Sequence, residues 1–258
     1  MSMNDTVYIE RWGSDGPRVV FIHGGAQGTS SAGHSNFQQQ EALGREGWEL
    51  IVPDRPGHGR SPDPSRPDDA EADAVWTAEL LGERAHLVGH SFGGLVAVAA
   101  AARRPAAVAS LVLIEPALFA VATKTAAVRK QLLKMAATMI LPFPPKARAE
   151  RMMRYLGIPK VFALNDDDLT ALGKSLKRGR FPKSAAIEGW VTTIRAAHIP
   201  VLVISSGSNA AFEAMGEIVA AKLDGRHVIV PIEHHFPQWN ATAFNPLVAK
   251  FWSDNAAR

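Results

Sequence analysis

Short apolar runs alternate with longer helical patterns along most of this chain of 258 residues. The apolar runs are rich in valine, isoleucine and leucine, and segments with glycine, proline and aspartate separate many of them from the helical patterns. This alternation predicts an α/β fold, in which a mostly parallel central sheet is flanked by helices. Strands are expected at Val7–Trp12, Arg18–His23, Trp48–Pro53, Ala85–Gly89, Val108–Ile114, Pro200–Ser205 and Val228–Pro231.

The alternation stops between Ile114 and Pro200, where the sequence holds only helical patterns. Helices are expected here at Thr123–Ile140, Pro145–Tyr155, Asp167–Leu176 and Ser184–Ala197. An all-helical insert between two consecutive strands is expected to lie over the edge of the sheet as a cap. The sequence therefore predicts a core formed by residues 1–118 and 198–258, and a helical cap formed by residues 119–197.

The motif Gly89-His90-Ser91-Phe92-Gly93 lies between a predicted buried strand and an alanine-rich predicted helix. In that context a G-x-S-x-G sequence forms a tight strand-to-helix turn that only small neighbouring residues tolerate. The strained turn lifts the serine hydroxyl out of the sheet, and the first amides of the helix point at the same place. Ser91 is therefore the predicted nucleophile.

A second glycine-rich segment, His23-Gly24-Gly25, lies at the end of the second predicted strand, Arg18–His23. A serine nucleophile needs two N–H donors from separate loops, which stabilise the oxyanion of the tetrahedral intermediate. We expect these donors to be the N–H groups of Phe92 and Gly25, with Ala26 as the alternative to Gly25. Glycine allows this loop to come close to the reacting carbon.

With two further segments, these motifs resemble the α/β-hydrolase superfamily, in particular its capped esterases, lactonases and perhydrolases. The further segments are Asp54-Arg55-Pro56-Gly57-His58-Gly59-Arg60-Ser61 and Glu233-His234-His235-Phe236-Pro237-Gln238. The resemblance covers nearly the whole chain. It implies an α/β-hydrolase fold with a mostly parallel sheet of about eight strands and a cap inserted after the sixth strand. It also implies that Asp54, His58 and Ser61 are structural.

The resemblance places a catalytic base on the loop after the last strand, because the chain order in this fold is serine, acid, histidine. His234 and His235 both lie on that loop. In the family pattern the histidine precedes an apolar residue, a proline and a polar residue, and this pattern matches His235. His235 is therefore the predicted base, and His234, which replaces the usual glycine, is the alternative.

The acid departs from the family pattern. In most relatives it is an aspartate just after the strand that follows the cap, but the stretch Ile204–Phe212 contains no carboxylate. Glu115 ends the strand before the cap, at the carboxyl edge of the sheet, and is the predicted acid that orients His235. Zearalenone-type lactone hydrolases resemble this chain in using a glutamate there. The alternatives are Glu213, Asn209 as a neutral partner, a serine–histidine dyad, and a purely structural Glu115.

These residues predict a serine hydrolase that cleaves a carboxylic ester or lactone through an acyl-serine intermediate. Two alternatives are a carbon–carbon bond hydrolase that uses the same triad and a ligand-binding protein that kept the fold without catalysis. Apolar residues of the cap suit a medium-sized hydrophobic substrate, and Phe143 and Trp190 are the predicted pocket residues. The same apolar set includes Met135, Met139, Met152, Met153 and Phe162.

Other features narrow the class of protein. The chain has no cysteine, so disulfides and cysteine metal sites are excluded, and it has neither a P-loop nor a dinucleotide-binding fingerprint. No metal and no cofactor are therefore expected. The polar amino-terminal segment and the lack of a long uncharged apolar stretch predict a cytoplasmic protein without a membrane partner. We expect a monomer or homodimer whose partner is a small-molecule ester or lactone.

The net charge of +3 is unevenly distributed. Residues 119–196 carry 15 Lys and Arg against 5 Asp and Glu, and these basic residues are scattered at helical spacing. This pattern lacks the basic stripe with interleaved aromatic residues that is typical of a nucleic-acid site, and no nucleic-acid partner is expected. It predicts a solvated helical surface, with an electropositive lid that favours anionic substrates as the alternative.

Overall fold

The computed structural model describes residues 7–25, 27–159 and 164–256. Within them, seven strands form one sheet in the order β1-β3-β2-β4-β5-β6-β7; β1 pairs antiparallel with β3, and the other pairs are parallel. The strands are β1 (Ile9–Trp12), β2 (Arg18–Ile22), β3 (Glu49–Pro53), β4 (Ala85–His90), β5 (Val108–Ile114), β6 (Val201–Ser205) and β7 (Arg226–Ile229). The predicted α/β fold is confirmed. The strand count is one below the expected eight because a single described strand precedes β2, so the cap follows the fifth strand rather than the sixth.

The helices follow the expected pattern of connections between strands. The α-helices of the described residues are α1 (Gly33–Phe37), α2 (Glu41–Gly44), α3 (Ala70–Leu80), α4 (Phe92–Arg103), α5 (Ala126–Ile140), α6 (Pro145–Leu156), α7 (Asp166–Ser175), α8 (Ser184–Ala196), α9 (Ala210–Lys222) and α10 (Ala241–Ser253). Short 3-10 helices occur at Gln38–Gln40, Pro105–Ala107, Phe119–Ala122 and Pro237–Trp239.

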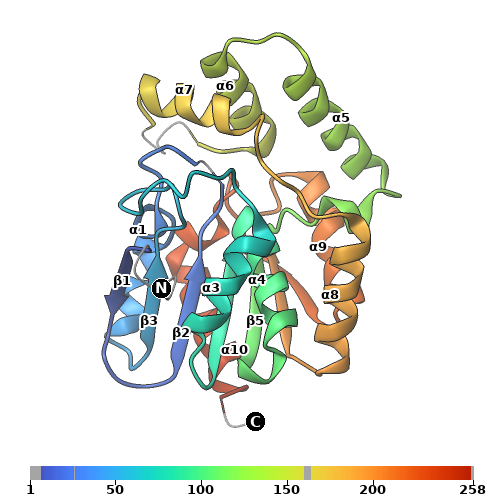
Figure 1. Cartoon of the computed structure of the whole chain (residues 1–258). Coiled ribbons are helices and arrows are strands. Elements are labelled where there is room, and N and C mark those ends of the chain that lie inside the picture. The colour runs from blue at the N-terminus through green and yellow to red at the C-terminus, as the bar shows by residue number, and fades with distance from the viewer. Residues whose placement is uncertain (1–6, 26, 160–163, 257–258) are drawn as a thin grey trace.

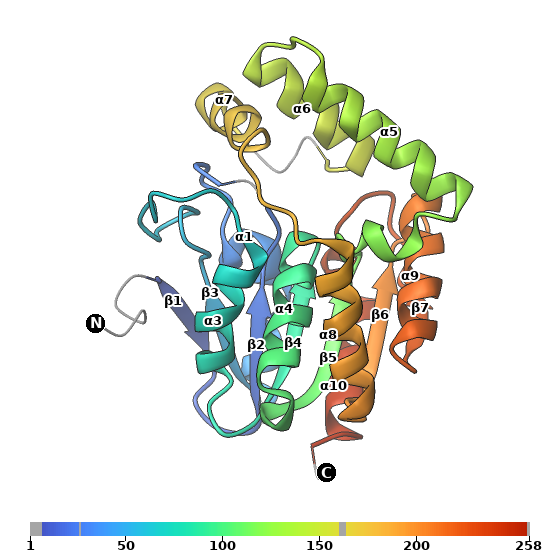
Figure 2. The same cartoon turned by 45° about the vertical axis from the view of Figure 1, so that its right-hand side comes forward.

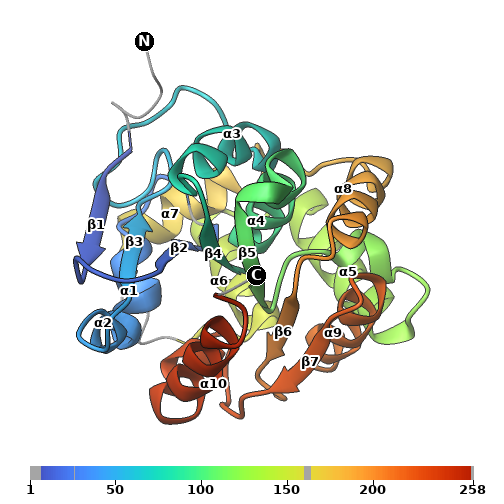
Figure 3. The same ribbon diagram turned by 90° about the horizontal axis from the view of Figure 1, so that it is seen from below.

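The sheet is a buried layer between two groups of helices, as Figures 1 and 3 show. Successive residues of a strand point to opposite faces, and the two apolar clusters of the core divide accordingly. Val20 and Ile22 of β2 join the cluster that contains α3, α4, α8 and α9. Val19 and Phe21 join the cluster that contains α1, α2 and α10. The central strands β4, β5 and β6 are buried along their whole length, as expected for parallel strands covered on both faces.

Helices α5, α6 and α7 form a separate group at one end of the sheet (Figures 1 and 2). They lie within the segment 119–197 that the sequence predicts as the cap. Helix α8 lies in the same segment but packs beside α4, and its residues Ile187, Val191 and Ile194 belong to the core cluster. The helices that lie over the sheet edge are therefore α5–α7. Among the described residues, no helix has both the length and the apolar character needed to cross a membrane.

Candidate active site

Ser91 forms the turn between β4 and α4, because β4 ends at His90 and α4 begins at Phe92. Its backbone has φ 54° and ψ −119°, a strained conformation for a residue other than glycine. Gly93 is needed for this turn, since a Cβ atom there would lie 2.1 Å from the carbonyl oxygen of Ile22. The motif therefore holds the Ser91 side chain at the carboxyl edge of the sheet.

The glycine loop after β2 passes directly against Ser91. A Cβ atom on Gly24 would lie 3.6 Å from Ser91 Oγ, and one on Gly25 would lie 3.8 Å from Phe92 Cβ. Phe92 is the first residue of α4, so its N–H group has no acceptor within the helix and sits at the positive end of the helix dipole. The two expected oxyanion donors, Gly25 and Phe92, thus lie beside the nucleophile. Ala26, the alternative donor, lies outside the described residues.

A buried guanidinium holds both of these segments. Arg55 Nη1 donates to the carbonyl oxygen of Gly24 at 2.8 Å, and its guanidinium carbon lies 4.6 Å from the centre of the Phe92 ring. The backbone N–H of Arg55 donates to His23 Nε2 at 2.8 Å, so that ring nitrogen is unprotonated. Burial lowers the pKa of His23 well below its usual value, which agrees with the neutral ring. Asp73 accepts from Arg55 Nε at 2.9 Å and compensates its charge.

His235 and Glu115 form a pair of almost fully buried side chains. His235 Nδ1 and Glu115 Oε2 are joined by a short hydrogen bond. The other carboxylate oxygen of Glu115 accepts from the backbone N–H of Ser206 at 2.8 Å. The backbone N–H of His235 donates to the carbonyl oxygen of Gly157 in the cap at 3.0 Å. The structure therefore brings the predicted acid and base together, and the loop after β6 contributes a backbone amide to the acid.

The alternative candidates lie elsewhere. Glu213 accepts from Ser205 Oγ at 2.6 Å and from Gly207 N–H at 2.8 Å. Asn209 caps α9 by accepting from the N–H of Ala211. The ring of His234 packs edge-on against Trp239, with 5.3 Å between the ring centres. None of these three side chains lines the cavity that contains Ser91.

The second ring nitrogen of His235 faces the site. His235 Nε2 is buried and makes no hydrogen bond to any described residue, and His235 lines the same cavity as Ser91. Hydrogen bonds between a nucleophile and its base are often long in a ligand-free enzyme and shorten once substrate binds. His235 Nε2 is therefore free to act as a proton acceptor in the cavity that Ser91 also lines.

His90 is a site residue to which the sequence analysis assigned no role. Its Nε2 donates to the carbonyl oxygen of His235 at 2.8 Å, and the two rings lie 4.8 Å apart between centres. Burial lowers the pKa of His90 well below its usual value. This hydrogen bond from His90 therefore holds the backbone of His235 in place. Its position next to Ser91 in the G-x-S-x-G motif is the sequence feature that could have identified His90 as a site residue.

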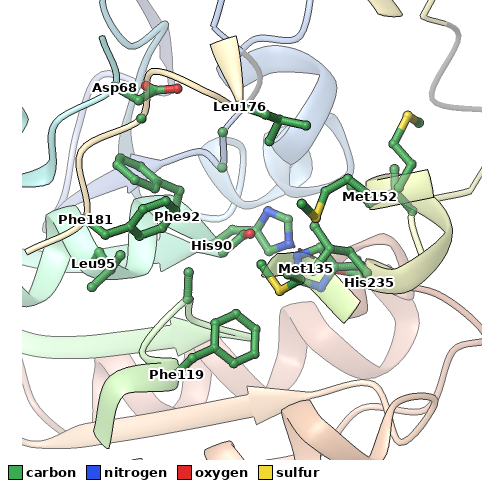
Figure 4. Close-up of a pocket in the computed structure, with 18 of the residues that line it drawn as sticks. Asp68, His90, Phe92, Leu95, Phe119, Met135, Met152, Leu176, Phe181 and His235 are labelled. Atoms are coloured by element: carbon green, nitrogen blue, oxygen red, sulfur yellow. Dashed lines mark hydrogen bonds between the residues drawn. The ribbon is translucent and has the colours of Figure 1, made fainter. Parts of the chain in front are cut away.

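A cavity of about 530 Å³ lies between the cap and the carboxyl edge of the sheet. Ser91, His90 and His235 line it from the core. Figure 4 shows His90 and His235 beside the apolar side chains that complete the lining. Most of its remaining lining is apolar, and three cap helices supply part of it: Leu132, Met135 and Met139 of α5, Met152, Met153 and Leu156 of α6, and Leu172 of α7 with the adjacent Leu176. The cavity can hold an apolar group with its reacting carbon near Ser91.

Neither predicted pocket residue lines this cavity, so both predictions are corrected. Trp190 lies on α8, which covers the sheet, and its side chain packs against the core cluster. Phe143 lies between α5 and α6, where the guanidinium carbon of Arg151 stands 4.4 Å from its ring centre. Both aromatic rings therefore make their contacts outside the cavity that contains Ser91. Phe162, from the same apolar set, lies outside the described residues.

Metal ligands do not gather around the nucleophile. Within the part of the chain that the structure describes, no three histidine or carboxylate side chains are arranged to hold a metal ion. The histidines and the carboxylate beside Ser91 are instead used in hydrogen bonds with each other and with the backbone.

Comparison with known proteins agrees with this architecture. A model of the Alpha/beta hydrolase family matches residues 19–247. Lipase LipV of Mycobacterium tuberculosis is 37% identical over 150 residues, which cover 56% of this chain and 54% of that protein. Esterase Rv0045c of the same organism is 36% identical over 110 residues, 41% of this chain and 35% of that protein. A 2-hydroxy-6-oxononadienedioate/2-hydroxy-6-oxononatrienedioate hydrolase of Paraburkholderia phymatum is 37% identical over 114 residues, 42% and 39% of the two chains. The chain therefore matches about half of the length of the first relative and less of the others.

Solved structures are similar over the whole fold. A point mutant of the meta-cleavage product hydrolase CumD has a TM-score of 0.69 at 20% identity, with 96% of this chain and 94% of that chain covered. A thermophilic esterase from Thermogutta terrifontis has a TM-score of 0.64 at 20% identity, with 96% and 93% covered. At this level of identity the similarity establishes the fold alone.

Proposed function

The chain belongs to the alpha/beta hydrolase family, and on that premise we propose that it cleaves a carboxylic ester or lactone through an acyl-serine intermediate. One observation carries the proposal. Ser91 sits on a strained turn at the floor of an apolar cavity, and the buried His235–Glu115 pair presents a free ring nitrogen to the same cavity. A nucleophile, a base and an acid arranged in this way are what acyl transfer requires.

In the proposed first step, Ser91 Oγ attacks the substrate carbonyl carbon while its proton passes to His235 Nε2. The negative charge that develops on the carbonyl oxygen is stabilised by the N–H groups of Phe92 and Gly25. The carboxylate of Glu115 stabilises the imidazolium that forms on His235. When the tetrahedral intermediate collapses, the carbon–oxygen bond to the alcohol breaks, and the alcohol leaves with the proton from His235.

In the second step, water takes the place of the alcohol. His235 Nε2 removes a proton from the water as its oxygen attacks the acyl carbon, and the same oxyanion donors hold the second intermediate. Collapse breaks the bond to Ser91 Oγ, which regains its proton from His235. The carboxylic acid is released and the enzyme returns to its starting state.

The acid of this proposed triad is Glu115 at the end of β5. Two observations support it over Glu213: the short hydrogen bond to His235 Nδ1, and the Ser206 N–H that holds the second carboxylate oxygen. In this placement the chain resembles zearalenone-type lactone hydrolases. The backbone of the loop that carries the aspartate in most relatives here contacts the carboxylate of a neighbouring strand.

The proposed substrate has a medium-sized hydrophobic acyl group. The leucine and methionine side chains of α5, α6 and α7 supply an adaptable apolar wall. Relatives named as a lipase and an esterase support the same class of reaction. A carbon–carbon bond hydrolase is the second candidate, because relatives named as 2-hydroxy-6-oxononadienedioate/2-hydroxy-6-oxononatrienedioate hydrolases align with this chain at 37% and 35% identity.

The experiment is hydrolysis of p-nitrophenyl hexanoate by the wild type and by Ser91→Ala, with circular dichroism to verify folding. We expect turnover by the wild type and a loss of several orders of magnitude in the variant, because members of a triad act as a unit. A fluorophosphonate should label the wild type once, at Ser91. Absence of turnover and labelling in a folded wild type would favour a ligand-binding protein, whereas cleavage of a vinylogous diketone without ester hydrolysis would favour the carbon–carbon hydrolase.

A further inference from the structure

The described residues that line the cavity carry a negative charge, whereas the cap segment as a whole is positively charged. Residues 119–196 carry 15 Lys and Arg against 5 Asp and Glu. Yet no Lys or Arg is found among the described residues that line the cavity, and Asp68 is their one carboxylate. Asp68 comes from the loop that precedes α3, in the core rather than in the cap. Figure 4 places it toward Phe92 and Phe181, across the cavity from His235.

The described basic side chains of α5 and α6 are engaged elsewhere or exposed to solvent. Arg148 donates to the carbonyl oxygens of Gly173 and Phe143. Arg151 stacks on Phe143, and Lys146 pairs with Asp166 at 2.7 Å. Further basic residues of α5 and α6 are exposed to solvent: Arg129, Lys130, Lys134 and Arg154. The positive charge of these seven residues therefore lies at the solvent-exposed surface of the cap or between its helices.

Asp68 is held in its charged form by Arg55. Burial acts to raise the pKa of Asp68, but the adjacent guanidinium of Arg55 outweighs it, and the pKa lies below its usual value. Arg55 Nη2 binds Asp68 Oδ1 in a short hydrogen bond. The Arg55 side chain is itself fully buried and does not line the cavity, whereas the Asp68 side chain is 12% exposed. Of the Arg55–Asp68 ion pair, only the negatively charged carboxylate of Asp68 therefore lines the cavity.

We propose that Asp68 makes this site selective for neutral acyl groups and against anionic ones, the reverse of the selectivity that a basic cap suggests. The inference rests on the proposed ester hydrolysis and assigns a substrate class to the same site. A substrate carboxylate enclosed here loses water, finds no described cation on the wall, and is repelled by Asp68. Like charges about 7 Å apart at an effective dielectric constant near 20 repel enough to change a rate constant by more than tenfold. Arg55 behind Asp68 offsets part of this, so we expect about tenfold.

The test compares two p-nitrophenyl esters of similar size that differ in charge. One carries adipic acid monoamide as its acyl group, which is neutral, and the other carries adipic acid with a free carboxylate, which is anionic at pH 7.5. The readout is the ratio of kcat/KM for the two esters. The wild type should favour the neutral ester about tenfold. Asp68→Asn should bring the ratio to about one or invert it, because the charge of Arg55 is then less compensated near the cavity.

Two further variants keep the result interpretable. Asp63→Asn removes an exposed carboxylate from the same loop that does not line the cavity, and it should leave the ratio unchanged. Asp68→Glu keeps the charge and should keep the preference for the neutral ester. If Asp68→Asn fails to fold, the wild-type ratio still tests the proposal, because equal or reversed kcat/KM values for the two esters would overturn it.

The failures of the two proposals are distinguishable. If the folded wild type hydrolyses neither these esters nor p-nitrophenyl hexanoate, the proposed ester hydrolysis is wrong. If it hydrolyses both adipic esters at equal kcat/KM, or prefers the anionic one, ester hydrolysis stands and the role of Asp68 is overturned. A preference that survives in Asp68→Asn would also overturn it, because the selectivity would then come from another residue.

Discussion

His235 Nδ1 and a carboxylate oxygen of Glu115 are hydrogen-bonded across 120 residues of sequence, and both side chains are almost fully buried. Glu115 follows β5, while His235 lies on the loop after β7, at the other end of a three-strand segment of the sheet. Between them, the loop after β6 supplies the Ser206 N–H to the same carboxylate. Three neighbouring connections at one sheet edge therefore form a single hydrogen-bonded unit.

Glu115→Gln tests this unit directly. The amide keeps the shape of the carboxylate but cannot stabilise an imidazolium or select the Nδ1–H tautomer, so kcat for p-nitrophenyl hexanoate should fall on the order of 10⁴-fold. Glu213→Gln is the matched control, because Glu213 bonds Ser205 and Gly207 instead of His235, and its kcat should stay within about tenfold of wild type. The reverse order of effects would move the acid to Glu213.

The two adjacent histidines should behave differently. His235→Ala removes the ring that faces the cavity and should lower kcat nearly as much as Ser91→Ala. His234→Ala removes a ring that packs on Trp239 outside the cavity and should cost less than tenfold. Steady-state kinetics of both variants on one ester decide the assignment. An inactive His234→Ala protein that is correctly folded would identify His234 as the base.

Arg55→Lys should impair the oxyanion site. Lysine keeps the positive charge but cannot bind Gly24, Asp68 and Asp73 at once, so kcat should fall roughly tenfold to a hundredfold with little change in KM. The affinity for a trifluoromethyl ketone, whose serine adduct carries an oxyanion, should fall by a similar factor.

Arg66→Lys is the control for that effect. Arg66 also pairs with Asp73, at 2.5 Å, but its other side-chain hydrogen bond goes to the carbonyl oxygen of Pro67 rather than to the glycine loop. Both readouts should therefore stay near wild type. Equal losses in Arg55→Lys and Arg66→Lys would mean that Asp73, rather than the oxyanion site, is the sensitive element.

Met152→Trp should shorten the acyl group that the cavity accepts. Met152 lines the cavity from α6, and a larger ring there fills space that a longer chain would occupy. The ratio of kcat/KM for p-nitrophenyl decanoate over acetate should fall at least fivefold. Phe143→Leu changes a side chain outside the cavity and should leave the ratio unchanged. A change in Phe143→Leu alone would restore Phe143 as a pocket residue.

The free energy of unfolding should decrease as the pH is lowered from 6.5 to 4. Burial lowers the pKa of His58 and of His86 from 6.5 to about 4 in the folded chain, whereas the unfolded chain keeps the ordinary value. Below pH 6.5 the unfolded state therefore binds protons that the folded state does not, and each such histidine costs about 1.4 kcal/mol per pH unit until about pH 4.

Urea denaturation at pH 7.5 and pH 5.5 measures this dependence. In His86→Gln, the slope of the unfolding free energy between these two pH values should be smaller by roughly 0.7 kcal/mol per pH unit, because the histidine contributes only below about pH 6.5. His198, an exposed histidine, offers the control His198→Gln, which should leave the slope unchanged. An unaltered slope in His86→Gln would show that His86 titrates alike in the folded and unfolded states.

The local features of this protein could be predicted from its sequence. Each predicted apolar run of strand length overlaps a strand of the sheet, so the order of strands and helices followed from the sequence pattern. The small residues of Gly89-His90-Ser91-Phe92-Gly93 indicated a tight strand-to-helix turn, because such a strained backbone tolerates only small neighbours. The position of Glu115 at a strand end followed in the same way.

The partners of these local features depended on the tertiary structure. Whether Glu115 or Glu213 meets His235 depends on which strand ends are neighbours in the sheet and on the rotation of each side chain about its own backbone. The sequence separation of the residues carries neither kind of information. For the same reason Trp190 of α8 was misplaced, since a helical pattern does not specify which surface its apolar face will cover. Phe143 was misplaced because it lies between α5 and α6, and only the packing of these two helices decides what that segment contacts. Arg55 and Asp68 acquire their roles only where the loop before α3 packs against Gly24 and Phe92, because a buried charge is defined by the groups that surround it.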